Sequence, residues 1–306
     1  MCGIVGLYLK NRALEPQLGA LFEPMLLEMT QRGPDSTGFA VYRDPAPAGQ
    51  VKLVLQHPDP AFDWASVVAA LSEQFKVDVA LSVHHTHCLL RLCVVESALR
   101  RYLHEHNPVY AVVSIGQHIE IYKEVGLPID VALAFGLRSM QGSHAIGHTR
   151  MATESAVTTA GSHPFSTGSD LCLVHNGSLS NHNRLRRKLE KAGAVFRTEN
   201  DSEVAAQYLD VQMQHGATLS EALTQALLDL DGFYTFTIGT SDGFAVLRDP
   251  IACKPAVMAE TDDWVAMASE YRALARLPGV KHARLWEPEP ATVYVWGRAA
   301  DAATLN

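Results

Sequence analysis

Short apolar strands and amphipathic helices alternate through the second half of the chain, and this alternation limits the fold more than any other feature. The predicted strands lie at 145–148, 171–174, 233–239, 244–248, 256–260, 264–268, 281–286 and 292–296. The predicted helices lie near 181–192, 202–214 and 219–230, with a shorter one at 269–277. Because a strand or a helix must bury its apolar side against another element, these blocks favour sheets that are covered by helices. The expected fold class is therefore α+β.

The N-terminal segment has the same character. Apolar residues 2–9 predict a strand, and apolar side chains at helical spacing over 18–31 predict an amphipathic helix. A turn is expected at 32–36 and a second strand at 38–43. Both strands are mostly apolar, so we expect them in the interior.

The segment between these strands and Ala145 differs in composition. Prolines and glycine cluster in 44–60 around a brief strand, and 61–140 predicts a small unit of mixed helices and strands. We therefore expect one domain over 1–306, interrupted by an α+β insertion at about 44–140.

Composition excludes several classes of protein. The net charge of −8 argues against a broad nucleic-acid surface, which needs clustered cations. No run of 18 apolar residues is present, so no membrane span is expected. The start of the sequence lacks a basic and apolar leader, and the five cysteines form no CxxC pair. We expect reduced thiols and a cytoplasmic location.

Cys2 is the first residue that indicates chemistry. A small second residue favours removal of the initiator Met, which leaves a thiol and an α-amine on one residue. An N-terminal amine has a pKa of about 7.7–8.0 and a free thiol about 8.5. The amine can therefore take the thiol proton without a histidine partner. The alternative is a cysteine that lies by chance on a buried strand.

Three further segments carry polar groups suited to binding. Arg150 ends a predicted strand and offers a guanidinium to a carboxylate, unless it is an ordinary surface arginine. Asn176 and Gly177 follow a predicted strand 171–174 and form either an oxyanion hole or a hairpin turn. Asp201 is suited to a substrate ammonium or, alternatively, to capping the next helix.

Together, the motifs resemble those of the class II glutamine amidotransferases, the N-terminal-nucleophile glutaminases. In chain order they are Met1-Cys2-Gly3, Arg32-Gly33-Pro34-Asp35-Ser36, the segment 147–153, His163-Pro164-Phe165, His175-Asn176-Gly177 and Asp201-Ser202-Glu203. The resemblance covers roughly 1–43 and 145–296. It implies a four-layer αββα sandwich, the fold of Ntn hydrolases.

The resemblance also implies a role for each matching residue. Cys2 would be the nucleophile and its own α-amine the base, while the Asn176 side chain and the Gly177 N–H would form the oxyanion hole. The residues implied at the glutamine pocket are Arg150 for the α-carboxylate, Asp201 for the α-ammonium, and Thr153, Arg32 and His163 around them. The products would be glutamate and ammonia.

Some positions depart from the family pattern. The family often has an aromatic residue where Met151 stands, and His-Gly where Glu154-Ser155 stands. A retained Met1 would acylate the Cys2 amine and remove the base. The alternative reading is then a catalytically silent scaffold or regulatory subunit, and N-terminal sequencing distinguishes the two.

The resemblance further implies a partner that uses the ammonia. The sequence has no P-loop and no cysteine spacing for an iron–sulfur cluster. It is most similar to the separate amidotransferase subunits of glutamate synthase-like systems, with N-methylglutamate synthase of methylamine metabolism as the nearest suggestion. The partners would be a flavin subunit carrying FMN, with or without an iron–sulfur cluster, and a β-helix subunit.

A histidine-rich segment, 84–88, has the residue types of a metal site. Its side chains would alternate between two faces of a strand, and no second Cys or His pair is spaced for tetrahedral zinc. We therefore expect no metal on this chain.

Overall fold

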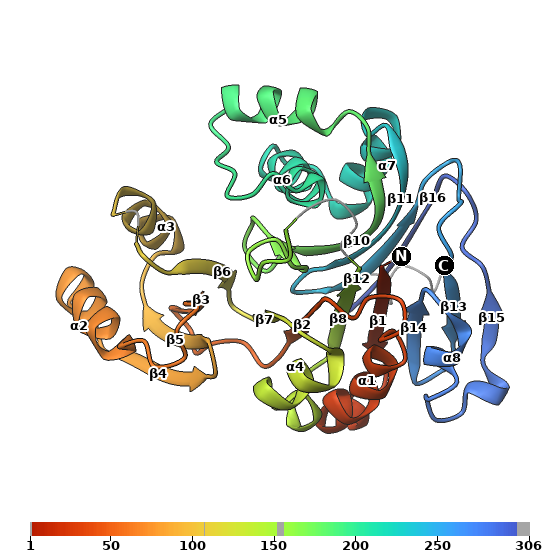
Figure 1. Ribbon diagram of the computed structural model, residues 1–306, viewed down its shortest axis with the longest axis horizontal. Coiled ribbons are helices and arrows are strands. Elements are labelled where there is room, and N and C mark those ends of the chain that lie inside the picture. The colour runs from red at the N-terminus through yellow and green to blue at the C-terminus, as the bar shows by residue number, and fades with distance from the viewer. Residues whose placement is uncertain (1, 107, 152–155, 299–306) are drawn as a thin grey trace.

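Two β-sheets packed face to face, with helices on both outer sides, form the main body of the molecule (Figure 1). The computed structural model describes residues 2–106, 108–151 and 156–298. The α+β class and the four-layer αββα sandwich predicted from the sequence are confirmed.

The larger sheet has seven strands in the order β15-β13-β14-β1-β8-β2-β7. Their bounds are β1 (Gly3–Leu9), β2 (Ser36–Tyr42), β7 (Ile119–Val125), β8 (His144–Arg150), β13 (Val257–Glu260), β14 (Trp264–Ala268) and β15 (Arg284–Trp286). Three helices cover its outer face: α1 (Leu18–Leu27), α4 (Pro128–Phe135) and α8 (Tyr271–Leu274).

The second sheet has five strands in the order β16-β12-β11-β10-β9. Their bounds are β9 (Phe165–Ser166), β10 (Cys172–Leu179), β11 (Gly232–Gly239), β12 (Gly243–Arg248) and β16 (Thr292–Gly297). The helices over it are α5 (His182–Lys191), α6 (Asp201–Gln214) and α7 (Leu219–Asp229), at the top of Figure 1.

Alternation of side chains along the central strands fills three apolar layers. In β1, Val5 and Leu7 pack beneath α1, whereas Ile4 and Tyr8 point between the two sheets. In β10, Leu173 packs beneath the upper helices, and Val174 joins Ile4 between the sheets. Because residues two apart share a face of a strand, this pattern determines the direction of every site residue on β1, β8 and β10.

One predicted boundary in β10 is wrong. We expected the strand to end at His175-Asn176-Gly177, but it runs on to Leu179. The reason is β11, which pairs with β10 along its full length, from Cys172 opposite Gly239 to Leu179 opposite Gly232. The Asn-Gly hairpin alternative is therefore excluded, since both residues lie inside a strand.

A third sheet, with four strands in the order β4-β5-β3-β6, lies to one side of the sandwich (Figure 1). Its elements are β3 (Gln50–Gln56), α2 (Trp64–Phe75), β4 (Val79–His84), β5 (His87–Cys93), α3 (Glu96–Glu105) and β6 (Ala111–Gly116), and they share a core of their own. The expected insertion at about 44–140 contains this unit. The same bounds include β7 and α4, which lie in and beneath the main sheet.

Among the described residues, no helix combines the length and the apolar character needed to cross a membrane.

Candidate active site

Cys2 lies directly before β1, where the strand is packed most tightly. A Cβ on Gly3 would come within 2.8 Å of both Met29 Cβ and Thr149 Oγ1, so only glycine fits beside Cys2. Ile4 exchanges hydrogen bonds with Ser269, its N–H donating to Oγ at 3.0 Å and its carbonyl accepting from the Ser269 N–H at 2.9 Å. Cys2 itself is half-buried and directly precedes this firmly held start of β1.

The inter-sheet face brings the nucleophile candidate and Arg150 together. Gly3 pairs with Thr149 and Ile4 with His148, and this antiparallel register sets Cys2 opposite Arg150. Arg150 lies two residues beyond His148, the partner of Ile4, so its side chain points between the sheets, as that of Ile4 does. Arg150 is buried, and one of its terminal nitrogens donates to the Ala156 carbonyl at 3.4 Å.

Asn176 reaches the same inter-sheet space from the opposite sheet. It lies two residues beyond Val174, so its side chain points toward β1 and β8. The side chain is 2% exposed, and its Nδ2 has no hydrogen-bond partner within the described part of the chain. A buried amide donor without a partner is uncommon, because it costs about 1–3 kcal/mol. It is a donor available to a ligand.

Gly177 supplies a second donor. Its pairing residue Tyr234 uses both backbone groups on Asp249: the Tyr234 N–H donates to Oδ2 at 3.1 Å, and the Tyr234 carbonyl accepts from the Asp249 N–H. Gly177 and Tyr234 are therefore a non-hydrogen-bonded pair, and the Gly177 N–H points away from β11. On that side β9 pairs only with Cys172 and Leu173, so no strand covers this N–H.

Only glycine fits at position 177. Its φ is +152°, and a Cβ there would lie 2.0 Å from the Phe233 carbonyl oxygen and 2.8 Å from His175 Nε2. The backbone conformation that exposes the N–H therefore depends on the missing side chain.

Asp201 begins α6 and lies at the end of β10. Its Oδ2 accepts from the Leu179 N–H at 2.8 Å, and its Oδ1 lies 3.7 Å from His175 Nδ1. Burial alone would raise the pKa of Asp201, but the His175 imidazole and the Leu179 N–H hold it at about 2. The carboxylate is therefore ionised at neutral pH, as an ammonium partner requires.

The predicted His163, together with His148, His175 and Ser202, to which the sequence analysis gave no role, connects these residues. The Ser202 hydroxyl lies 2.8 Å from His163 Nε2 and 2.9 Å from His175 Nδ1, while His148 Nε2 lies 3.1 Å from the His175 carbonyl. The rings of His148 and His163 stack at 3.9 Å. Burial lowers the pKa of His148 to about 3 and that of His163 well below its usual value, so both are neutral. The spacing of His148 and Arg150 was the available signal, since residues two apart share a strand face.

Lys123, also missed from the sequence, holds the segment that carries His163. Its Nζ donates to the carbonyls of Ser162 (2.7 Å), Ala160 (3.3 Å) and Pro164 (3.3 Å). Burial lowers the pKa of Lys123 to about 8. The ammonium thus binds three carbonyls of one loop, of which those of Ser162 and Pro164 are buried.

Of the remaining predicted site residues, the structure describes Arg32 but not Thr153. Arg32 lies against Cys2, with Nε donating to the Cys2 carbonyl at 3.0 Å. Thr153 and Met1 lie outside the described residues. His85 lies in the turn between β4 and β5, where its ring contacts Phe135. In the described ranges, no three His, Cys, Asp or Glu side chains are arranged to hold a metal.

Comparison with known proteins identifies the family. The glutamine amidotransferase domain family matches residues 148–276. The glutamine amidotransferase-like protein GlxB of Rhizobium meliloti is 58% identical over 97% of this chain and 98% of its own length. A putative glutamine amidotransferase of Methanothermobacter thermautotrophicus is 31% identical, over 96% of this chain and 99% of its own.

Solved structures show the same fold. The glutamine phosphoribosylpyrophosphate amidotransferase from B. subtilis aligns over 97% of this chain with a TM-score of 0.62, at 20% identity. This chain spans about half of that protein, 48% of its length. Two relatives match over nearly their full length, and the fold is shared with a solved amidotransferase. The chain therefore belongs to the glutamine amidotransferases of class II, the N-terminal-nucleophile type.

Proposed function

We propose that Cys2 hydrolyses the side-chain amide of glutamine. The observation that carries the proposal is the buried Asn176 Nδ2, which has no partner within the described ranges and lies beside the Gly177 N–H that points away from β11. Donors aimed at one space beside a nucleophile stabilise the negative charge that develops on a carbonyl oxygen. The family to which the chain belongs supports the same reaction.

The proposed reaction proceeds in two steps. The Cys2 α-amine takes the thiol proton, and the sulfur attacks the amide carbon to form a tetrahedral intermediate whose oxyanion accepts from Asn176 and Gly177. Return of the proton to the nitrogen releases ammonia and leaves a thioester. Water, deprotonated by the same amine, then cleaves the thioester to glutamate and restores the thiol.

Two charged residues match the free amino acid. Arg150 suits the α-carboxylate, since a guanidinium can donate two parallel hydrogen bonds to it. The ionised Asp201 suits the α-ammonium. We propose His163 as a further residue of the glutamine pocket, because its ring contacts the Ser202 hydroxyl next to Asp201 and stacks on His148. Thr153 stays a proposed pocket residue on family resemblance alone.

Substitution of Cys2 tests the assignment. Cys2→Ala is expected to abolish glutamine hydrolysis, measured as glutamate formation, with an unchanged circular dichroism spectrum. Wild-type turnover by this variant would refute the nucleophile assignment. N-terminal sequencing is the accompanying control, because a retained Met1 would leave no free amine and would favour the silent scaffold.

We propose further that the products of glutamine hydrolysis, glutamate and ammonia, serve a synthase on a partner chain. The support is the resemblance to separate amidotransferase subunits of glutamate synthase-like systems, with N-methylglutamate synthase as the specific suggestion. The partners would be an FMN subunit, with or without an iron–sulfur cluster, and a β-helix subunit.

Product analysis of the assembled complex tests the partner. The complex is supplied with glutamine or glutamate, methylamine and 2-oxoglutarate, and the products are identified by mass spectrometry. N-methylglutamate is the expected product. Glutamate formed only with a reductant and 2-oxoglutarate would indicate an ordinary glutamate synthase, and amination of a sugar phosphate or nucleotide precursor would refute both.

A further inference from the structure

Arg32 makes few contacts for a buried arginine. Its side chain is 10% exposed, Nε donates to the Cys2 carbonyl at 3.0 Å, and Nη1 donates to Glu270 Oε1 at 2.9 Å. The third nitrogen, Nη2, is buried and has no hydrogen-bond partner within the described ranges. Glu270 is thus the side-chain acceptor that orients this guanidinium.

Glu270 follows directly on the residue that fixes the start of β1. Ser269 holds both backbone groups of Ile4, and Glu270 reaches the Cys2 carbonyl through Arg32. Ser269 and Glu270, which directly follow β14, therefore hold the chain on both sides of Gly3.

The Cys2 carbonyl matters because Cys2 lies outside the paired part of β1. Rotation about the N–Cα bond of Gly3 would turn the Cys2–Gly3 peptide plane and move the Cys2 carbonyl, thiol and α-amine together relative to the sheet. The bond from Arg32 to the carbonyl opposes this rotation. A displacement of about 1 Å at a reacting group can cost about 10²-fold in rate.

We propose that Glu270 is a positioning residue for the Cys2 nucleophile: it orients Arg32, and Arg32 fixes the Cys2 carbonyl. The proposal rests on the proposed glutaminase function and adds a residue from the distant end of the chain to its machinery. Glu270 does not itself contact the nucleophile. Its effect is therefore on the geometry of Cys2 and not on Arg150 or Asp201, the residues proposed for the two charges of glutamine.

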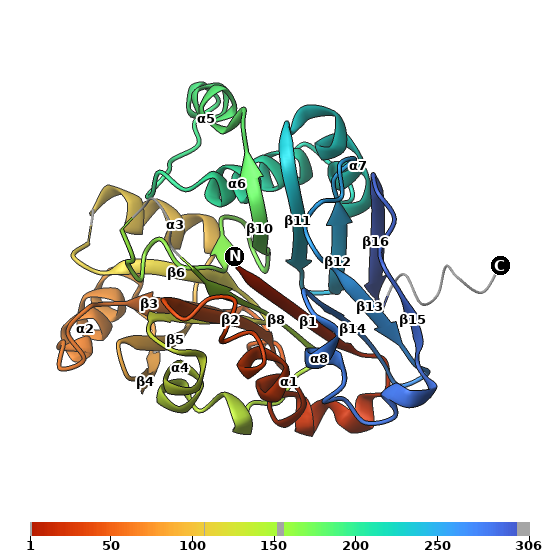
Figure 2. The same cartoon turned by 45° about the vertical axis from the view of Figure 1, so that its right-hand side comes forward.

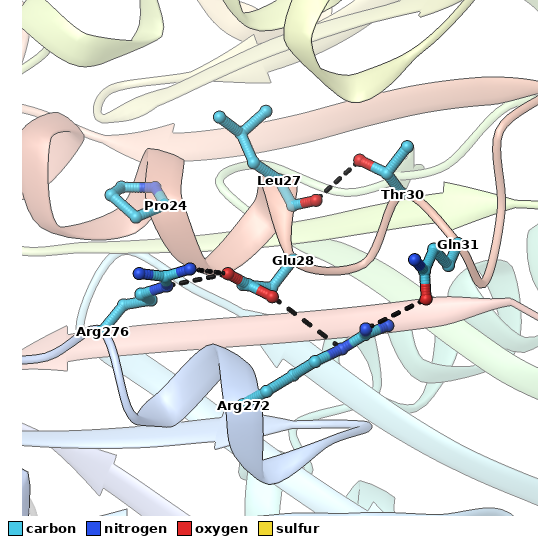
Figure 3. A pocket seen from close by; sticks show the side chains of 7 residues that line it. All are labelled: Pro24, Leu27, Glu28, Thr30, Gln31, Arg272 and Arg276. Carbon is cyan, nitrogen blue, oxygen red and sulfur yellow. Dashed lines mark hydrogen bonds and ion pairs between the residues drawn. The ribbon is translucent and has the colours of Figure 1, made fainter.

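A neighbouring carboxylate provides a matched control. Glu28 accepts from Arg276 Nε at 2.7 Å, and its other oxygen lies 3.9 Å from Arg272 Nε. Figure 3 shows Glu28 between these two arginines, at the wall of a pocket of about 470 Å³. Arg272 also binds Glu270 at 2.7 Å, so both carboxylates belong to one network of ion pairs. Glu270 contacts Arg32 in that network, and Glu28 has no ion pair with it.

The experiment compares Glu270→Ala, Glu270→Gln and Glu28→Gln with the wild type. We expect Glu270→Ala to lower kcat for glutamine at least about tenfold while KM stays within about twofold. Glu270→Gln keeps an acceptor for Arg32 Nη1 and should lose less, whereas Glu28→Gln should match the wild type. Thermal unfolding should show similar midpoints for the two Gln variants.

A second measurement does not depend on turnover. The rate at which iodoacetamide alkylates Cys2 is followed by mass spectrometry of the N-terminal peptide. We expect this rate to differ from the wild type at least about threefold in Glu270→Ala and not in Glu28→Gln. If the wild type fails to hydrolyse glutamine, the proposed function is refuted, and the alkylation rates alone decide the role of Glu270. Wild-type kcat and wild-type alkylation in Glu270→Ala would overturn the positioning role, as would an equal loss in Glu28→Gln.

Discussion

At the residue scale, the site is defined by polar groups that the fold leaves without partners. Asn176 Nδ2 and Arg32 Nη2 are both buried and unpaired within the described ranges, and the Gly177 N–H lies outside the ladder. In a stable interior such groups are usually satisfied. Here they lie on two motif residues, Asn176 and Arg32, and Arg32 also donates to the Cys2 carbonyl.

Removing the Asn176 amide should affect the rate more than the binding. Asn176→Ala is expected to lower kcat by about 10²–10³ with little change in KM, because the donor acts on charge that develops in the transition state. Asp201→Asn should mainly raise KM, because an ammonium contact exists in ground and transition states alike. Steady-state kinetics measure both, and a pure KM effect for Asn176→Ala would reverse the two roles.

Asp201 should also stabilise the fold in a pH-dependent way. Its pKa is about 2 in the folded chain and 3.8 in its unperturbed state, so the stabilisation is complete above about pH 4 and is lost as the pH falls through about 2. The shift corresponds to about 2 kcal/mol. Urea unfolding of the wild type and Asp201→Asn should therefore differ at pH 7 and converge near pH 2. A constant difference would contradict the ionised assignment.

At the scale of elements, a single lysine connects the main sheet to the loop that carries His163. Lys123→Met should leave three carbonyls without this donor, of which those of Ser162 and Pro164 are buried, and each unsatisfied buried group costs about 1–3 kcal/mol. We expect faster hydrogen exchange over 160–165 and a higher KM for glutamine. Lys188→Met, on the exposed side of α5, is the control. Unchanged exchange in Lys123→Met would show that the loop is held by other contacts.

Elements were easier to predict than their contacts. The apolar runs located β1, α6 and α7 to within a residue or two, because the spacing of apolar residues within a short stretch of sequence determines which side is buried. The extension of β10 through Asn176 and Gly177 was missed, since it depends on pairing with β11 more than fifty residues later. The same reason explains the missed residues: Ser202, Lys123 and Glu270 act through partners that only the tertiary fold brings close.

The motif residues themselves could be chosen from the sequence because their types are chemically specific. The sequence shows Cys2, Arg150 and Asp201 directly as a thiol, a guanidinium and a carboxylate. What the sequence could not provide is the face on which each one lies. That follows from the register of β1 against β8 and from the alternation along β10.

At the scale of the whole molecule, the third sheet is attached to the sandwich by polar contacts and by Val54, Leu89 and Val113, which belong to the apolar layer between the two main sheets. The Asp170 carboxylate accepts from the N–H groups of Gln117, His118 and Ile119, and Lys52 pairs with Glu120 at 2.9 Å. The opposite face of this sheet forms a core of its own with α2 and α3. Figure 2 shows the unit at the side of the sandwich, apart from the helices α5 and α7.

The main sheet does not need this unit to remain continuous. β2 ends at Tyr42 and β7 begins at Ile119, and these two residues pair directly as antiparallel neighbours. Replacing 44–117 by a two-residue Asn-Gly turn would therefore convert β2 and β7 into a hairpin in their existing register. Asp170 and Glu120 would lose partners, so Asp170→Asn in the full chain serves as the control for that loss.

We expect the shortened chain to fold and to lose its association with the proposed synthase partner. Glutaminase activity of the isolated chain should persist within about tenfold, because Cys2, Asn176 and Arg150 lie on strands that the deletion does not touch. Co-purification with the partner subunits measures the association, and glutamate formation measures the activity. Unchanged assembly would assign the partner contact to the sandwich itself. Loss of activity with assembly retained would instead show that the third sheet acts on the site, through contacts such as that between Arg197 and the Val112 carbonyl beside the start of α6.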